Sequence, residues 1–280
     1  MTLYNRQISL QIGDVRMSGL NIEFNVQKFL SSQPNTMDVK IYNLSEATRS
    51  RLESFPYSQG VAEKRGTTPV QLIAGYEGQT SSIFVGRLRR VQHYRDQSEI
   101  ITEVEAGDGE KAQGVRFSRS YKKGTPVLTI LTQLAAAMGV GEGNLRQAFA
   151  SRVSGGIGNV IAGGLSLHGY AVDSLSKLLE SRGLDWSVQD QTLQVLGPQQ
   201  GLRGSAIRLR ADTGLVGVPT LDNKGVVTAT CLLIPEVNPG RRVQITSEFI
   251  SGLFTVTQAA YKGSLFGSTF EINLEGKRAD

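Results

Sequence analysis

The residue types that most often carry catalysis or bind metals are scarce in this chain of 280 residues. It has two histidines, His93 and His168, and one cysteine, Cys231. Neither histidine has a partner at ligand spacing or a neighbouring nucleophile, and a lone histidine is more often structural or exposed than catalytic. Cys231 lies between Thr230 and Leu232 in an apolar run, which indicates a buried thiol. The sequence therefore predicts no metal site, no cofactor and no disulfide.

One glycine-dense segment could cradle a phosphate. Gly155, Gly156 and Gly158 resemble the start of a dinucleotide-binding fingerprint, in which the backbone approaches a pyrophosphate. The third glycine of that fingerprint would stand where the chain has Ile161, and no Gly-Lys-Ser/Thr follows. We therefore interpret the segment as a surface loop and keep its three glycines as candidate interface residues.

Three acids could support hydrolysis. Glu103 and Glu105 are two residues apart, so in a strand they share a face and could approach one substrate, and Glu110 follows closely. Charged residues that alternate on the wet face of a sheet are the commoner case. A hydrolase stays open as an alternative, whereas our leading prediction has no catalytic residues.

The charge balance is mildly basic, with 30 Lys+Arg against 25 Asp+Glu and a net charge of +5. Two groups of basic residues could form a positive surface: Lys111, Arg116, Arg119, Lys122 and Lys123, and further along Arg203, Arg208, Arg210, Arg241 and Arg242. Aromatic residues that could stack on nucleic-acid bases are limited to Phe117 and Tyr121. A protein-facing or solvated patch is therefore favoured over a nucleic-acid-binding surface.

The first part of the chain has the pattern of a β-sheet. Strict alternation of apolar and polar residues over 20–27 predicts a half-buried strand, and the segments 39–41, 70–76, 83–91 and 100–106 continue the pattern. Ser45 is a good N-cap, so a short helix should run from Glu46 to about Leu52. No apolar run reaches the roughly 18 residues of a membrane span, so we expect a soluble chain without membrane insertion.

The pattern changes to α/β near residue 120 and returns to sheet after about 200. Thr125 as N-cap and Pro126 at the first helical position predict a helix that ends at Gly139. A second helix is expected over 172–182, followed by a hairpin over 186–195 and by strands between 226 and 274. The sequence thus predicts a mainly β fold with an α+β insertion. The predicted domains are 1–118 (β), 119–200 (α/β, with the Gly-rich loop) and 201–280 (β).

Two ordered segments carry a resemblance to a known family. Residues 38–52 read DVKIYNLSEATRSRL, a strand that runs into a short capped helix, and residues 213–245 read TGLVGVPTLDNKGVVTATCLLIPEVNPGRRVQI. The middle unit, with GTPVLTILTQLAAAMG, the Gly-rich loop and HGYAVDSLSKLLESRGLDWSVQDQTLQVL, fits between them. Together the segments resemble the baseplate hub proteins of tailed bacteriophages, the central hub of contractile-type tails.

The resemblance implies an architecture and a role. In that family two tail-tube-like β domains per subunit, repeated three times, form a pseudo-sixfold ring. We therefore expect two tail-tube-like β-barrel or sandwich domains flanking a small α/β unit. The chain would form a homotrimer that adapts the sixfold tail tube to the threefold central spike, without catalysis. The expected location is the virion, in the tail baseplate, after assembly in the host cytoplasm.

The resemblance also implies partners and interface segments. The partners would be further copies of the chain, the tail tube protein, the central spike protein, the end of the tape-measure protein and other baseplate proteins. Genome DNA would only pass through the lumen. The candidate interface residues are Asn43, Leu44, Ser45, Gly155, Gly156, Gly158, Thr213, Gly214 and Gly217. A sixfold tail-tube or distal-tail ring protein, which shares the β module, is the alternative within the same virion class. A tail-associated cell-wall hydrolase is the alternative from the enzyme class.

Overall fold

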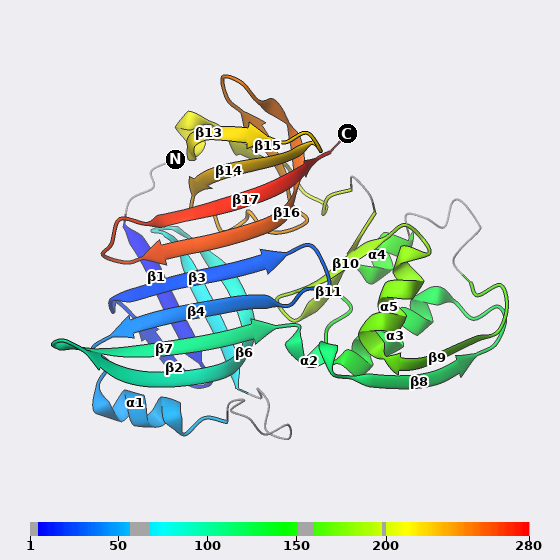
Figure 1. The fold of residues 1–280 in the computed structure, drawn as a ribbon, viewed down its shortest axis with the longest axis horizontal. Coiled ribbons are helices and arrows are strands. Elements are labelled where there is room, and N and C mark those ends of the chain that lie inside the picture. The colour runs from blue at the N-terminus through cyan, green and yellow to red at the C-terminus, as the bar shows by residue number, and fades with distance from the viewer. Residues whose placement is uncertain (1–4, 57–67, 151–159, 198–199, 280) are drawn as a thin grey trace.

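A computed structural model describes residues 5–56, 68–150, 160–197 and 200–279. Most strands belong to one extended sheet, and a smaller helical unit lies at one side of it (Figure 1). The predicted mainly β fold with an α+β insertion between two β units is confirmed.

The first part of the chain forms strands because apolar residues recur at every second position. In β3 (Ile22–Phe29) and β4 (Asn35–Tyr42), buried residues alternate without a break with residues that are half-exposed or exposed. Ser45 caps helix α1, since its hydroxyl accepts a hydrogen bond from the Thr48 backbone N–H. The elements are β1 (Arg6–Ile12), β2 (Val15–Ser18), β3 (Ile22–Phe29), β4 (Asn35–Tyr42), α1 (Glu46–Glu53), β5 (Pro69–Tyr76), β6 (Gln79–Asp96) and β7 (Glu99–Asp108).

The middle unit packs helices against two short two-stranded antiparallel sheets. Its elements are α2 (Glu110–Gln113), β8 (Arg116–Tyr121), α3 (Val127–Met138), α4 (Leu145–Ala150), β9 (Leu165–Tyr170), α5 (Ala171–Glu180), β10 (Asp185–Gln189) and β11 (Thr192–Leu196). Helix α3 begins one residue later than predicted, because Pro126 is extended and takes the N-cap position. The Thr125 hydroxyl donates backwards to the Lys122 carbonyl, at 2.7 Å, and does not cap the helix. Gly139, at φ +71°, ends the helix as predicted.

The last part of the chain returns to strands. It comprises β12 (Ile207–Leu209), a 3₁₀ helix η3 (Ala211–Thr213), β13 (Leu215–Leu221), β14 (Val226–Leu232), β15 (Arg242–Thr246), β16 (Ser251–Ser264) and β17 (Phe270–Arg278). The turn from β13 to β14 is closed by Asp222, whose carboxylate accepts the backbone N–H groups of Lys224 and Val226 at 2.8 Å.

The strand order of the large sheet contains an internal repeat. The order is β13-β14-β17-β16-β3-β4-β7-β6-β5-β1-β2, with β15 also paired to β16 and β12 to β15. Strands β3-β4-β7-β6-β5, which we call the N-terminal module, follow the same order as strands β13-β14-β17-β16-β15, the C-terminal module. The two modules are joined in the sheet by the antiparallel pair β16 and β3.

The repeat extends to an irregularity in the sheet. The pairing of β6 with β7 shifts by one residue between Leu88 and Arg90, and that of β16 with β17 shifts between Val256 and Gln258. Aligned on these shifts, Ala106 of the first module corresponds to Gly276 of the second, and Val104 corresponds to Leu274. A bulge at the same place in both modules indicates that one structural plan is used twice.

Two separate cores stabilise this arrangement. One runs without a break through both modules, from Ile22 in β3 to Leu274 in β17, while the other fills the middle unit around Leu131, Leu175 and Trp186. The domain boundaries after residues 118 and 200 stay a prediction. No helix within the described ranges combines the length and apolar character needed to cross a bilayer.

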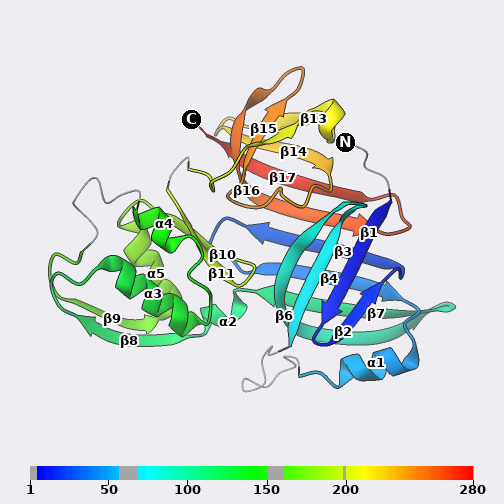
Figure 2. The ribbon, with the colours of Figure 1, turned by 180° about the vertical axis from the view of Figure 1, so that it is seen from behind.

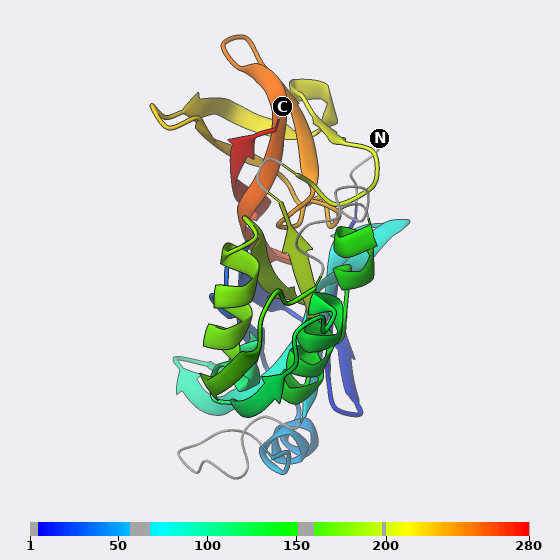
Figure 3. The ribbon, with the colours of Figure 1, turned by 90° about the vertical axis from the view of Figure 1, so that its right-hand side faces the viewer.

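The molecule is layered around the N-terminal module. Seen from behind, β1 and β6 run across β3 and β4 as a second layer (Figure 2). Seen from the side of the middle unit, its green helices stand in front of the strands (Figure 3). Strand β13 lies at one end of the stacked strands and α1 lies beyond the other end (Figure 1).

Candidate functional site

One face of the sheet is polar across both modules. The pairing register places Glu271, Lys262 and Asn25 side by side, and Asp38, Glu105 and Arg90 continue the row through the N-terminal module. We call this surface the polar face; its charged and amide side chains include those of Glu23, Asn25, Asp38, Lys40, Arg90, Glu103, Glu105, Lys262, Glu271, Asn273 and Glu275. Acidic side chains outnumber basic ones on it, although the whole chain carries a net charge of +5.

Carboxylates gather most closely where β3, β4 and β7 meet. A shallow hollow of about 350 Å³ is lined there by Glu23, Asp38, Lys40, Glu103 and Glu105, among others. Partial burial, together with the nearby negative charge of Glu105, raises the pKa of Asp38. The polar face is therefore an electronegative surface on which cations are attracted and anions repelled.

The acids that could serve a hydrolase are engaged in ion pairs. Glu103 lies 3.3 Å from the Lys40 ammonium and accepts a hydrogen bond from the Tyr94 hydroxyl at 3.0 Å. Glu105 pairs with Arg90, and Glu110 pairs with Arg89 at 2.6 Å. The pairs of Glu103 and Glu105 join neighbouring strands, and cross-strand pairs of this kind stabilise a sheet surface.

The two histidines lie in different units and have different surroundings. His93, on β6, contacts the Thr102 hydroxyl at 2.9 Å and lies 3.5 Å from the Glu53 carboxylate. Burial lowers the pKa of His93 despite that carboxylate. His168, on β9, is exposed and contacts the Ser118 hydroxyl at 2.7 Å.

The cysteine is enclosed in the core, as predicted. Cys231 is buried, and burial raises the pKa of its thiol to about 12. Across the part of the chain that the structure describes, no three His, Cys, Asp or Glu side chains cluster in a way that could hold a metal ion.

The first group of candidate interface residues forms the connection from β4 to α1. Asn43 has φ +57°, and its backbone and side chain both bond to Ile100 at the start of β7. Leu44 is buried, and its carbonyl accepts a hydrogen bond from Arg49. With Ser45 capping the helix, these residues fix where α1 leaves the sheet.

The second group shapes the start of β13. The Thr213 hydroxyl accepts the Arg210 backbone N–H at 2.9 Å and donates to the Arg208 carbonyl at 3.0 Å. Gly214 and Gly217 have φ values of +105° and +67°, which favour glycine, and Gly217 lies where the pairing of β13 with β14 is irregular. The chain thereby presents β13 as an edge strand.

Within one molecule the two groups do not meet. Asn43, Leu44 and Ser45 adjoin α1, and Thr213, Gly214 and Gly217 adjoin β13 at the other end of the stacked strands (Figure 1). The third group, Gly155, Gly156 and Gly158, lies outside the described residues.

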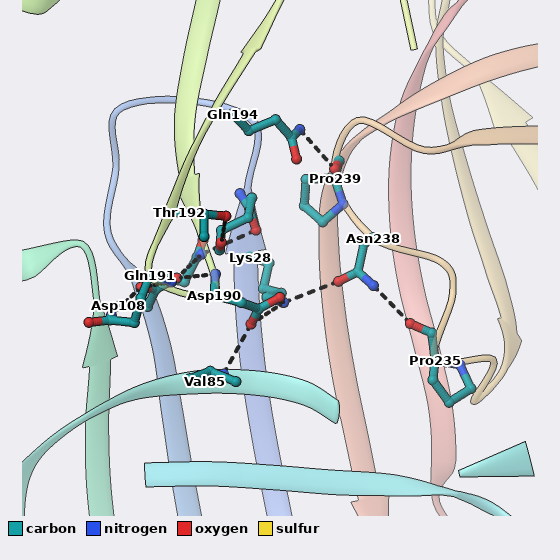
Figure 4. Close-up of polar contacts among 12 residues, drawn as sticks. Lys28, Val85, Asp108, Asp190, Gln191, Thr192, Gln194, Pro235, Asn238 and Pro239 are labelled. Carbon is teal, nitrogen blue, oxygen red and sulfur yellow. Dashed lines mark hydrogen bonds and ion pairs between the residues drawn. The ribbon is translucent and has the colours of Figure 1, made fainter. Parts of the chain in front are cut away.

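The sequence reasoning missed a network of polar residues that joins the modules to the middle unit (Figure 4). The ammonium group of Lys28, which is fully buried, lies 2.9 Å from the Asp190 carboxylate and donates to the Asn238 side chain at 3.1 Å. The same carboxylate accepts the Val85 backbone N–H at 3.0 Å. We call this network the junction; it connects β3 and β6 of one module, the β10–β11 turn, and the β14–β15 connection.

Asp108 holds the turn of the β10–β11 hairpin in place. Its carboxylate accepts the backbone N–H groups of Asp190 and Gln191 at 2.8 and 3.0 Å, and the Asn35 side chain at 3.1 Å. Burial raises the pKa of Asp108, while the hydrogen bonds from Gln191 and Asn35 oppose that rise. A second attachment, from the Gln194 side chain to the Pro239 carbonyl at 3.1 Å, fastens the hairpin to the C-terminal module.

One signal in the sequence could have revealed the junction. Lys28 continues the alternation of Ile22, Phe24 and Val26, so it occupies an inward-facing position where a charge requires a partner. The identity of that partner is not local, since Asp190 lies 162 residues away.

The two basic groups of the sequence are not one surface. Arg116 and Arg119 lie on β8, at the far side of the middle unit from β12 and β15, which carry Arg208 and Arg242 (Figure 1). Arg241 is used structurally, since it donates to the carbonyls of two residues in the segment before β12.

Comparison with known proteins gives one family and a shared fold. A family model described as "Baseplate hub gp41" matches residues 6–276. No curated protein matches the sequence significantly. Similar solved structures include the 43 kDa tail protein of prophage MuSo2 from Shewanella oneidensis, with 8% identity and a TM-score of 0.65 over 98% of both chains.

Two further structures share the fold. The tail protein from Neisseria meningitidis MC58 has 11% identity and a TM-score of 0.66, over 98% of this chain and 97% of that one. The E. coli c3393 protein has 12% identity and a TM-score of 0.61, over 97% of this chain and 77% of that one. That protein is described as a component of the type VI secretion system, with structural similarity to the T4 bacteriophage tail proteins gp27 and gp5. At these identities the similarity establishes the fold alone.

Proposed function

The chain belongs to the baseplate hub gp41 family, and from this premise we propose that it is the central hub of a bacteriophage tail baseplate. In this role it forms a homotrimer that adapts the sixfold tail tube to the threefold central spike. The role is structural and involves no catalytic step. Its place is the virion, after assembly in the host cytoplasm.

The repeated strand order is the observation that carries the proposal. One chain contains two modules with the order 1-2-5-4-3, joined side by side in one sheet. Three such chains present six modules of one plan around an axis. A threefold assembly can in this way offer an approximately sixfold rim to the tail tube and still match a threefold spike.

The polar face supports a role around a channel. It spans both modules, so in a ring of modules it can form a continuous inner wall. An electronegative wall repels the phosphate backbone, and genome DNA could then pass without binding. The same lumen is where we place the end of the tape-measure protein.

The remaining partners meet the ends and periphery of the ring. We propose that the tail tube protein binds one rim, the central spike protein the other, and other baseplate proteins the outer surface. The middle unit, attached through the junction, is held rigidly enough to serve as part of such a surface.

The number of copies in the assembly tests the proposal. Native mass spectrometry of the purified chain, alone and with its spike protein, should give three copies of the chain. Six copies would favour the tail-tube or distal-tail ring alternative. A chain that stays monomeric in both samples contradicts the proposed hub.

A further inference from the structure

The two modules differ in how many neighbours their corresponding strands have. Strand β16 pairs with β15, β17 and β3, whereas its counterpart β6 pairs with β5 and β7. Strand β3 pairs with β4 and β16, whereas its counterpart β13 pairs with β14. Among the described strands, β6 and β13 are therefore each one neighbour short of their counterparts. Among the described strands the seam between β16 and β3 occurs once. Its two halves recur unpaired on β13, at one end of the strand order, and on the second half of β6, beyond its pairing with β5.

The bulges fix which residues of the two long strands correspond. Arg90 follows the register shift in β6 as Gln258 does in β16, and these residues are paired with Glu105 and Glu275. Counting on, Tyr94 corresponds to Lys262, and His93 corresponds to Tyr261. The two side chains also contact corresponding parts of their modules. His93 lies against Glu53, in the connection from β4 to β5, and Tyr261 donates to Asn238, in the connection from β14 to β15.

The edge strands correspond through their pairing with β4 and β14. Asn25 pairs with Asp38 and Val26 with Met37, and in the other module Thr220 pairs with Thr228 and Leu221 with Val227. Thr220 therefore takes the place of Asn25, and Leu221 that of Val26. The extra residues around Gly217 in β13 precede this stretch and leave its register unchanged.

From this correspondence we infer that β13 of one copy pairs antiparallel with the 93–96 segment of β6 in the next copy, repeating the β16–β3 seam between chains. In the existing seam Lys262 faces Asn25 and Tyr261 faces Val26. The intermolecular register then places Tyr94 opposite Thr220 and His93 opposite Leu221. The occupant of each free edge is thus a second copy of this chain.

Side-chain exposure agrees with a missing neighbour. Val26 is 0% exposed beneath the existing seam, whereas Leu221, in the corresponding place, is 44% exposed. Val216 and Val218 of the same edge strand are also exposed, at 41% and 67%. Unpaired edge strands with exposed apolar residues are the usual template for strand addition.

The seam also unites the two described groups of predicted interface residues. Asn43 bonds to Ile100, beside the turn that follows β6. By the same correspondence Asp96 of β6 faces Val216, close to Gly214 and Gly217 at the start of β13. Residues at opposite ends of one molecule would then meet across the boundary between two copies.

Such a contact is heterologous, since different edges meet, so it can repeat from copy to copy. Closure of the series after three copies rests on the proposed function. The assignment of β13 and β6 as the two edges that pair rests on the strand correspondence alone. The two claims can therefore fail separately.

Paired cysteines test the seam. In the double variant Thr220→Cys/Tyr94→Cys the two positions face each other across the inferred seam, at the Cβ separation of directly opposed antiparallel residues. After oxidation, nonreducing denaturing electrophoresis should show cross-linked chains up to a closed three-copy product. Either single variant alone should run as one chain, and an equimolar mixture of the two should stop at two copies. The native Cys231 is buried and does not interfere.

A matched pair on a different edge provides the control. The double variant Thr220→Cys/Arg16→Cys places the second cysteine on β2, an exposed position at the other end of the strand order, and should not cross-link. The seam would be overturned if the protein forms trimers but the Thr220→Cys/Tyr94→Cys chains do not cross-link. It would also be overturned if only the Thr220→Cys/Arg16→Cys chains cross-link. Cross-linked species that close at six or continue without closing would support the seam and contradict the homotrimer. Chains that remain monomeric and unlinked contradict both.

Discussion

At the scale of single residues, the junction depends on a buried charge. Lys28 is 0% exposed and its partner Asp190 is 37% exposed, so the ammonium is enclosed and the carboxylate is partly solvated. We predict that Lys28→Met lowers the free energy of unfolding by about 3 kcal/mol, because it removes one partner of the pair and leaves the carboxylate without its counter-charge. Urea denaturation at one protein concentration measures the loss.

An ion pair of the same residue type on the polar face is the control. Lys40 is 48% exposed and pairs with Glu103, so Lys40→Met should cost less than about 1 kcal/mol. The double variant Lys28→Met/Asp190→Asn should recover part of the stability that Lys28→Met loses. Equal losses for the two single lysine variants would show that the junction contributes no more than a surface pair.

His93 gives the unfolding equilibrium a dependence on pH. Burial holds its pKa below the 6.5 of an unperturbed histidine, so between these two values the unfolded chain binds more protons than the folded chain. The free energy of unfolding should therefore fall as the pH drops below about 6.5, by no more than about 1.4 kcal/mol per pH unit. Above pH 6.5 the contribution of His93 should not change with pH. Urea denaturation between pH 7.5 and 5.5 measures this slope.

The exposed histidine supplies the comparison. His93→Gln should flatten the slope below pH 6.5, whereas His168→Gln, on the exposed face of β9, should retain it. Identical slopes in all three proteins would mean that His93 exchanges no proton on unfolding in this range.

At the scale of elements, local patterns predicted what local forces determine. The alternation in β3 and β4 reflects burial of one side of each strand, and α1 begins where Ser45 can cap it. The error at Thr125 is also local, because its hydroxyl donates to the Lys122 carbonyl and the extended Pro126 takes the capping position.

Long-range pairing could not be read in the same way. The alternation over 83–91 predicts a strand, but not that β6 extends over 18 residues with a bulge and changes partners along its length. The partner of Lys28 is likewise set by how the β10–β11 turn docks, which depends on the whole fold. Of the candidate interface residues, sequence analysis correctly placed Asn43 to Ser45 at the start of a helix, but their relation to Thr213 depends on the order of the strands.

At the scale of the whole molecule, duplication explains why the strands of both modules belong to one large sheet. The modules share a core and a seam, so the contact that would join neighbouring subunits already exists inside each subunit. The middle unit interrupts the chain between the modules and is fixed to both by the junction and by Gln194. The middle unit should therefore keep the same place relative to the modules in any assembly that they form.

The central claim is that the chain is a threefold hub on the tail axis, and the rotational symmetry of this protein in the intact tail tests it most directly. Cryo-electron microscopy of the virion tail, reconstructed without imposed symmetry at the baseplate, should show three copies in a ring between the tail tube and the spike. Six modules should surround the lumen, with the polar face inward. Six copies in the ring, or copies at the periphery of the baseplate, would contradict the account.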